Sequence, residues 1–103
     1  MNNSRKISWF IGLNTNTGKT FDQITAAQKV ADIMELSGIQ SFSIGSNVGY
    51  WQSKPEQTLH VWLIDTENIG ENLVAAIAGK MSADFEQECV LTTIEECEFD
   101  FVS

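Results

Sequence analysis

The stretch LHVWLI at residues 59–64 decides the fold, because it is apolar on both faces of an expected strand. Side chains alternate across a strand, and a strand that is apolar on both faces is typical of the middle of a sheet. One face carries only aliphatic side chains: Leu59, Val61 and Leu63. The other face carries His60, Trp62 and Ile64. The stretch therefore predicts a central strand with two different faces.

The order of expected elements around this strand occurs twice in the chain. A strand over residues 7–13, a helix after Thr20 and a strand over residues 39–51 form the first half. The strand over residues 59–64, a helix after Asn68 and a strand from about Cys89 to Ile94 form the second. Thr20 and Asn68 are each followed three residues later by Gln or Glu, which is the pattern of a capping box. Two strand–helix–strand halves predict a split βαβ sheet with both helices on one face.

This order of elements (βαββαβ) resembles the ferredoxin-like superfold, and more loosely the dimeric α+β-barrel proteins, in which two such sheets meet. The resemblance implies an α+β fold with a four-stranded antiparallel sheet, formed by residues 1–103 as a single domain. The superfold hosts regulatory ligand-binding modules, haem or quinone-acting enzymes and plain interaction domains. Function must therefore be argued from a site.

The sheet face away from the helices is the first place to look for that site. Its expected aromatic residues are candidates for a ligand site or an interface: Phe10, Tyr50, Trp51, His60 and Trp62. Exposed aromatic clusters mark interaction surfaces. A second copy, a small ligand or stacked nucleic-acid bases could cover them. Alternatively, the C-terminal tail could fold over the face through Phe99 and Phe101.

The charge of the chain narrows the possible partners. Fourteen acidic residues against six basic ones give a formal net charge of −8. Binding to nucleic acid depends on cationic contacts to phosphates, so nucleic acid is an unlikely partner. The acidity favours solubility or docking to a basic protein surface. We expect a homodimer formed through the aromatic face, with a possible further protein partner.

The sequence contains no recognisable catalytic, metal-binding or cofactor-binding set. His60 is the only histidine, and two cysteines eight residues apart do not complete a zinc site. We interpret His60 as a hydrogen-bonded interface residue, with a general base or haem ligand as alternatives. The loop at residues 12–20 resembles a phosphate-binding Walker A loop, but it has five residues between its glycines where that motif has four. We therefore predict a polar loop that ends in a helix cap, and no cofactor.

Two free thiols and the lack of an apolar leader or membrane span predict a cytoplasmic protein. Three functions remain open. The first is a non-enzymatic interaction module that self-associates through the aromatic face. The second is a small-molecule-binding protein or enzyme with a pocket around His60, Trp62 and Tyr50. The third is an acidic inhibitor of a nucleic-acid-binding protein.

Overall fold

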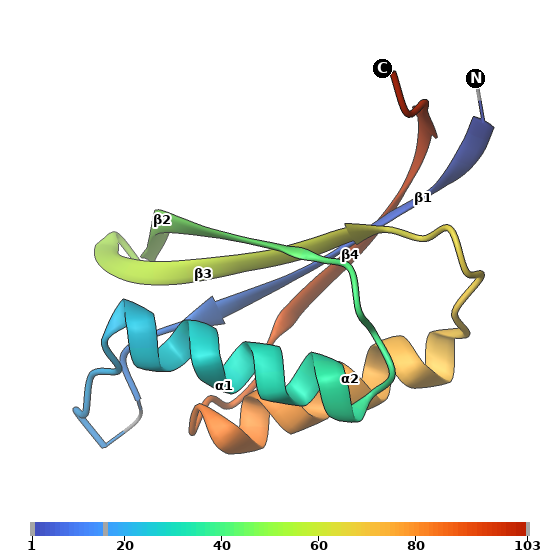
Figure 1. Cartoon of the computed structure of the whole chain (residues 1–103). Helices are drawn as coiled ribbons and strands as arrows, with labels where there is room; N and C mark the ends of the chain where they lie inside the picture. Colours follow the sequence, from blue (N-terminus) through green and yellow to red (C-terminus); the bar gives the residue numbers. More distant parts are fainter. Residues whose placement is uncertain (1, 16, 103) are drawn as a thin grey trace.

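The computed structural model describes residues 2–15 and 17–102, except for the side chain of Trp51. Its elements follow in the predicted order: β1 (Asn2–Gly12), α1 (Gln23–Leu36), β2 (Ser43–Trp51), β3 (Lys54–Ile64), α2 (Glu71–Asp84) and β4 (Leu91–Phe99). The strands form one antiparallel sheet in the order β2-β3-β1-β4. Both helices lie against the same face of this sheet (Figure 1). The ferredoxin-like α+β fold predicted from the sequence is confirmed.

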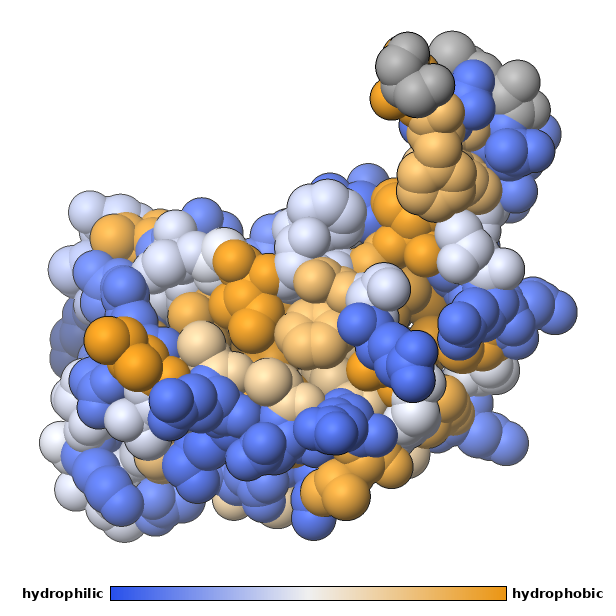
Figure 2. All heavy atoms as spheres, viewed as in Figure 1, coloured by the Kyte–Doolittle hydropathy of each residue, from blue (hydrophilic) through white to orange (hydrophobic). Residues whose placement is uncertain are grey.

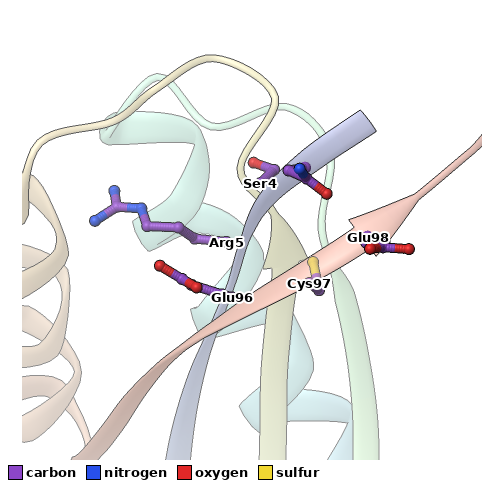
Figure 3. Close-up of a pocket in the computed structure, with 6 residues that line it drawn as sticks. Ser4, Arg5, Glu96, Cys97 and Glu98 are labelled. Atoms are coloured by element: carbon purple, nitrogen blue, oxygen red, sulfur yellow. The ribbon is translucent and has the colours of Figure 1, made fainter. Parts of the chain in front are cut away.

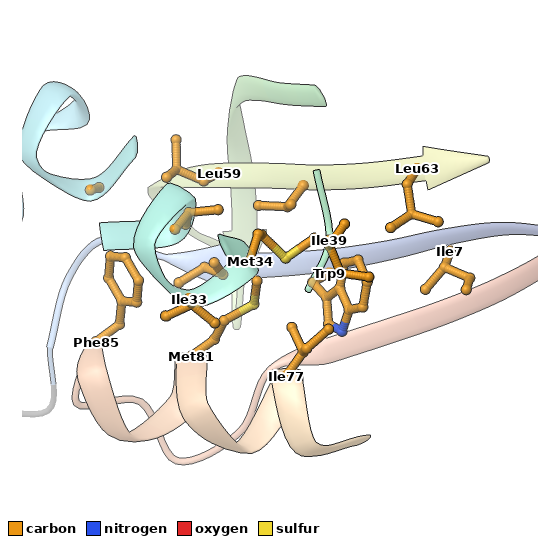
Figure 4. Packing of buried hydrophobic residues seen from close by; sticks show 14 of the residues in the cluster. Ile7, Trp9, Ile33, Met34, Ile39, Leu59, Leu63, Ile77, Met81 and Phe85 are labelled. Atoms are coloured by element: carbon orange, nitrogen blue, oxygen red, sulfur yellow. The ribbon is translucent and has the colours of Figure 1, made fainter. Parts of the chain in front are cut away.

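The core lies between the sheet and the two helices. Trp9 of β1 is its largest member, and its indole nitrogen donates a hydrogen bond of 3.2 Å to the carbonyl oxygen of Val74 in α2. Figure 4 shows side chains from both helices and from β1 and β3 around this tryptophan. The fully buried members come from residues of one parity in each central strand and one stripe of each helix. They include Ile7, Ile11, Val61, Val30, Met34, Ile77 and Met81.

Both helices begin two residues later than the sequence predicts. Asp22 caps α1, because its carboxylate accepts a hydrogen bond of 2.9 Å from the backbone N–H of Thr25. Thr20, the predicted cap, instead forms a β-bridge with Asn14. Gly70 is the cap residue of α2, and Asn68 lies before it with φ of 57°. The helix periodicity predicted the right elements, but at α1 another polar residue, Asp22, is the cap, and at α2 the cap position is occupied by a glycine that forms no side-chain cap bond.

The outer strands extend beyond the predicted limits. β1 begins at Asn2, and β4 runs to Phe99, so the acidic segment after Ile94 continues the sheet. Asn2 pairs with Phe99 in this register. The ends of β1 and β4 form a two-stranded ribbon that projects past the helices (Figure 1). We call residues 2–5 and 96–99 the arm.

The β2–β3 connection turns at Gln52 and Ser53, which have φ of 50° and 65°. A pair of left-handed residues is the geometry of a tight hairpin turn. The sequence Ser53-Lys54-Pro55-Glu56 predicts a hairpin turn at which the strands separate, because proline cannot donate to a strand ladder. This prediction is wrong: Pro55 lies within β3, opposite Tyr50. Proline is compatible with this position because β1 pairs with β3 only from Thr58 onward, leaving Pro55 a neighbour on one side alone.

Within the described residues, no helix is long and apolar enough to cross a membrane.

Candidate functional site

The face of the sheet that the helices leave uncovered carries the candidate site, and we call it the open face. The strand registers place its side chains in rows across the sheet. One row runs through Gly45 of β2, His60 of β3, Phe10 of β1 and Leu91 of β4. The next row runs through Ser43, Trp62, Ser8 and Thr93. Three predicted site residues, Phe10, His60 and Trp62, therefore lie together at the centre of this face.

Phe10 and His60 form a stacked pair, with ring centroids 4.4 Å apart and ring planes within 9° of parallel. The Nε2 atom of His60 lies 3.0 Å from the hydroxyl oxygen of Ser8, which is buried. Burial lowers the pKa of His60, and the positive charge of Lys6 lowers it further against the opposing effect of Glu95. The imidazole is therefore neutral at pH 7 and presents a flat, uncharged surface together with Phe10.

Trp62 lies beside this pair, with the ammonium of Lys6 4.9 Å from the centre of its ring. Leu91, at the other side of Phe10, is 63% exposed. The C-terminal tail does not cover these side chains, since Phe101 and Val102 are more than 80% exposed and Phe101 packs edge-to-face on Phe99 in the arm. The alternative in which the tail folds over the open face is therefore wrong. The reason is that β4 extends to Phe99 and carries the tail away with the arm.

Tyr50 does not belong to the open face. It pairs with Pro55 and has the parity of Ser46 and Gln57, both of which receive hydrogen bonds from the Gln23 side chain of α1. Tyr50 therefore lies on the helix side of the sheet, where it is 73% exposed. The side chain of Trp51, the other predicted residue of this strand, lies outside the described part of the chain.

Sequence reasoning missed a polar group at the end of the open face. The carboxylate of Glu56 in β3 occupies the space above Gly12 of β1, since a Cβ atom built on Gly12 would lie 2.2 Å from Glu56 Oε1. The same Cβ would lie 3.1 Å from Oε1 of Gln87 in the loop between α2 and β4. The signal was Gly12 itself, because a glycine inside a strand often marks the close approach of another group.

Glu56 and Gln87 differ in how the chain holds them. Gln87 is fixed by its side-chain nitrogen, which donates to the carbonyl oxygens of Asn14 at 2.7 Å and Phe85 at 3.2 Å. Both ion pairs of the described residues, Arg5–Asp65 and Lys19–Glu86, leave Glu56 out. Glu56 is thus a half-buried carboxylate without a cationic partner among the described residues, next to an aromatic surface.

A hollow of about 630 Å³ lies at the arm, lined by Asn3, Ser4, Arg5, Glu96, Cys97 and Glu98 (Figure 3). Figure 2 shows the arm standing away from the rest of the molecule. Arg5 is the hollow's cation, but its guanidinium is already bound 3.0 Å from Asp65 and 2.8 Å from the carbonyl oxygen of Ile69. The Nη2 atom of Arg5 is therefore already bound by two acceptors that do not line the hollow.

Asp65 is a carboxylate whose two oxygens both have hydrogen-bond donors within the chain. Burial acts to raise its pKa, but the N–H of Ile69 at 3.0 Å and the guanidinium of Arg5 outweigh this and lower it. Ser4 also donates its hydroxyl to the Asp65 carbonyl oxygen. These contacts join β1 to the loop before α2, and we interpret them as structural.

In the described part of the polar loop, residues 14–15 and 17–20, no phosphate cradle is formed. The N–H of Gly18 donates to the carbonyl oxygen of Thr15, and the N–H of Lys19 donates to the Thr15 hydroxyl. Lys19 itself lies 3.9 Å from Glu86. Backbone amides that already bond within the loop cannot converge on an anion. Among the described residues, no group of three or more His, Cys, Asp or Glu side chains is placed to hold a metal ion.

No known family model matches the chain, and no curated protein sequence matches it. Solved structures do share its fold. A phage SAM lyase in its apo state superposes with a TM-score of 0.78 at 23% identity, over 91% of this chain and 81% of that one. A phage SAM lyase in complex with S-methyl-5′-thioadenosine gives 0.69 at 24% identity, over 90% and 81%.

A second group of similar structures has a different description. CPII from Thiomonas intermedia K12, a nitrogen regulatory PII-like protein bound to ADP, AMP and bicarbonate, gives a TM-score of 0.57 at 11% identity. The superposition covers 99% of this chain and 98% of CPII. Each of these proteins is described with a small adenosine-containing molecule as substrate or ligand. At these identities the likeness establishes the fold that they share with this chain.

Proposed function

We propose that this chain binds S-adenosylmethionine and cleaves it as a lyase, in an assembly of copies joined through the open face. The observation that carries the proposal is Glu56, a half-buried carboxylate that has no cationic partner among the described residues and lies beside the aromatic side chains of the open face. The fold shared with a phage SAM lyase over 91% of the chain supports this choice of ligand.

The chemistry of S-adenosylmethionine fits this site. Its sulfonium is a cation, its adenine is a flat aromatic base, and its amino group is a cationic hydrogen-bond donor. A carboxylate near a cation in a partly dry site stabilises it electrostatically, and the acidity of the whole chain attracts a cationic ligand. A neutral stacked pair such as Phe10–His60 is the kind of surface on which a base stacks.

Cleavage by a lyase requires neither water nor an oxidant. The bond between the sulfonium sulfur and the amino-acid carbon chain breaks, and its electron pair goes to sulfur. S-methyl-5′-thioadenosine then leaves as a neutral thioether. The carbon chain restores its lost bond internally, either by closing a ring onto its own carboxylate or by forming a double bond with loss of a proton. Because S-methyl-5′-thioadenosine carries neither the sulfonium charge nor the amino group, Glu56 binds the substrate more tightly than this product.

The apolar surface of the open face supports the self-association that the proposal includes. Phe10, Trp62 and Leu91 form an apolar surface that no segment of the described chain covers. Burying three such side chains against another copy contributes roughly 5 kcal/mol before the costs of association. The apolar centre would then be an interface, and the polar end with Glu56 would remain at its rim for the ligand.

The test is to incubate the purified protein with S-adenosylmethionine and to quantify S-methyl-5′-thioadenosine by mass spectrometry against a protein-free sample. We expect release well above the spontaneous rate, a loss of at least about tenfold in Glu56→Gln, and no change in Glu35→Gln, an exposed carboxylate on α1. Release at the protein-free rate would reject the lyase proposal.

The second candidate is a non-enzymatic interaction module, which the uncovered apolar surface favours. Native mass spectrometry distinguishes the two, since it gives both the subunit count and any retained ligand. Oligomers with no bound adenosine compound and no turnover would favour the module. A monomer would contradict self-association in either form.

A further inference from the structure

We propose that Gly12, Glu56 and Gln87 form a recognition site for a primary ammonium group. The assignment of this group to the amino-acid part of S-adenosylmethionine rests on the proposed function. The ammonium site itself rests on the geometry alone.

Two acceptor oxygens converge over Gly12. Oε1 of Glu56 and Oε1 of Gln87 lie 2.2 Å and 3.1 Å from the point that a Cβ atom on Gly12 would occupy. They come from different parts of the fold, one from β3 and the other from the loop between α2 and β4. Only the missing side chain of Gly12 allows both to approach the same point.

The two oxygens differ in charge, but both lack a hydrogen-bond donor among the described residues. The Gln87 side chain is oriented by its nitrogen, which donates to Asn14 and Phe85, so its oxygen must point the other way. Within the described residues, no hydrogen bond to either oxygen is formed by another side chain or backbone N–H. Two acceptors that face one point without a donor between them disfavour each other, and a donor placed there relieves this.

The charge of the pair selects the kind of donor. A carboxylate next to an amide oxygen carries one negative charge, which favours a cation over a neutral amine. A primary ammonium has three N–H donors and can bond to both oxygens at once. A quaternary cation carries the same charge but cannot donate. S-methyl-5′-thioadenosine lacks the ammonium that S-adenosylmethionine carries on its amino-acid chain.

Gly12→Ala provides the test, because it displaces the flexible end of Glu56 and leaves the backbone free to keep its conformation. Gly79→Ala is the matched control, since a Cβ there meets nothing within 4 Å. The first probe is n-butylammonium, and tetramethylammonium is the comparison cation. Binding of each is monitored by NMR through the chemical shifts of the Gly12 backbone amide and the Gln87 side-chain amide.

We expect saturable shifts of these signals with n-butylammonium in the wild type and in Gly79→Ala. We expect them to be lost in Gly12→Ala and to be much weaker with tetramethylammonium. Equal shifts with both cations, or none in the wild type, would overturn the ammonium site. This arm does not depend on whether the protein binds an adenosine compound.

The second arm measures affinities for the two adenosine compounds. We expect Gly12→Ala to weaken the binding of S-adenosylmethionine by about tenfold, while that of S-methyl-5′-thioadenosine changes by less than about twofold. An equal loss for both compounds would contradict recognition of the ammonium. Wild-type protein that binds n-butylammonium but neither adenosine compound would reject the proposed function and leave the ammonium site standing.

Discussion

The two faces of this sheet both carry a tryptophan and a carboxylate, but these side chains differ in the contacts that they make. Trp9 of β1 faces the helices, is fully buried and bonds through its indole nitrogen to Val74. Trp62 of β3 faces the other way, is partly exposed and has the ammonium of Lys6 over its ring. On the helix side the carboxylate of Asp65 is bound by Arg5 and Ile69, while on the open face that of Glu56 has no ion-pair partner among the described residues. The comparison teaches that Trp9 and Asp65 find their partners within one chain, whereas the described residues supply no cationic partner for Glu56.

The largest expected effect is the difference in stability loss between variants of Trp9 and Trp62. Trp9→Ala removes a fully buried indole and leaves a cavity, so we expect the free energy of unfolding to fall by about 4 kcal/mol. Trp62→Ala in the monomeric state should cost only about 1 kcal/mol, because the ring is partly exposed. Chemical denaturation at low protein concentration measures both. Equal losses would mean that the open face is already packed within one chain.

The two carboxylates provide the next comparison. Asp65→Ala breaks the contacts with Arg5 and Ile69 and should cost about 3 kcal/mol. Glu56→Ala should change the free energy of unfolding by less than about 0.5 kcal/mol, since it removes no contact of this kind. A large loss in Glu56→Ala would show that this carboxylate has a structural role.

The pH dependence offers a check on Asp65. Its folded-state pKa lies below the ordinary value of 3.8, so the stabilisation is present above pH 3.8 and is lost as the pH falls through the folded-state pKa. Acid unfolding of Asp65→Ala should lack this contribution. An unchanged acid midpoint would contradict it.

Self-association should depend on the open face alone. We expect Phe10→Ala to raise the dissociation constant of the assembly by about 30-fold, which corresponds to about 2 kcal/mol for a buried aromatic side chain. Leu36→Ala serves as the control, because Leu36 is 82% exposed on α1 and lies on the other side of the molecule. Sedimentation equilibrium measures both variants. Equal weakening would place the interface elsewhere.

The smallest effect concerns His60. Its folded-state pKa lies below the ordinary value of 6.5, so the unfolded chain binds the proton first and stability falls as the pH drops below 6.5. The fall ends once the pH passes below the folded-state pKa. His60→Gln should flatten this slope. As the only histidine, His60 gives an unambiguous NMR titration, and a midpoint above 6.5 would contradict burial as the main cause.

The sequence predicted the fold and the centre of the open face, because both depend on alternation along a strand. Parity placed Phe10, His60 and Trp62 on one face without knowledge of the tertiary structure. It could not place Tyr50, because the register of β2 depends on a turn at Gln52 and Ser53, not at Pro55. A shift of one residue reverses the face to which every side chain of a strand points.

The polar end of the open face could not be predicted in the same way. Glu56 and Gln87 are 31 positions apart in the sequence and come together only because β3 and the α2–β4 loop meet near Gly12. Gly12 indicates that some group approaches β1 closely, but a single sequence does not tell which distant residues do so. The extension of β4 to Phe99 agrees with the sequence, because acidic and apolar residues alternate after Ile94 as they do in a half-exposed strand.

The pairing of Asn2 with Phe99 also has a consequence for how the protein acquires its structure. β1 lies between β3 and β4, so one edge of β1 can form its hydrogen bonds only after β4 has been synthesised. Contacts between distant parts of a chain form slowly, because a long loop must close before they stabilise anything. During synthesis on a ribosome, β1 therefore keeps an unpaired edge until β4 has emerged. Over that interval the emerging chain is most exposed to pairing with the wrong strand.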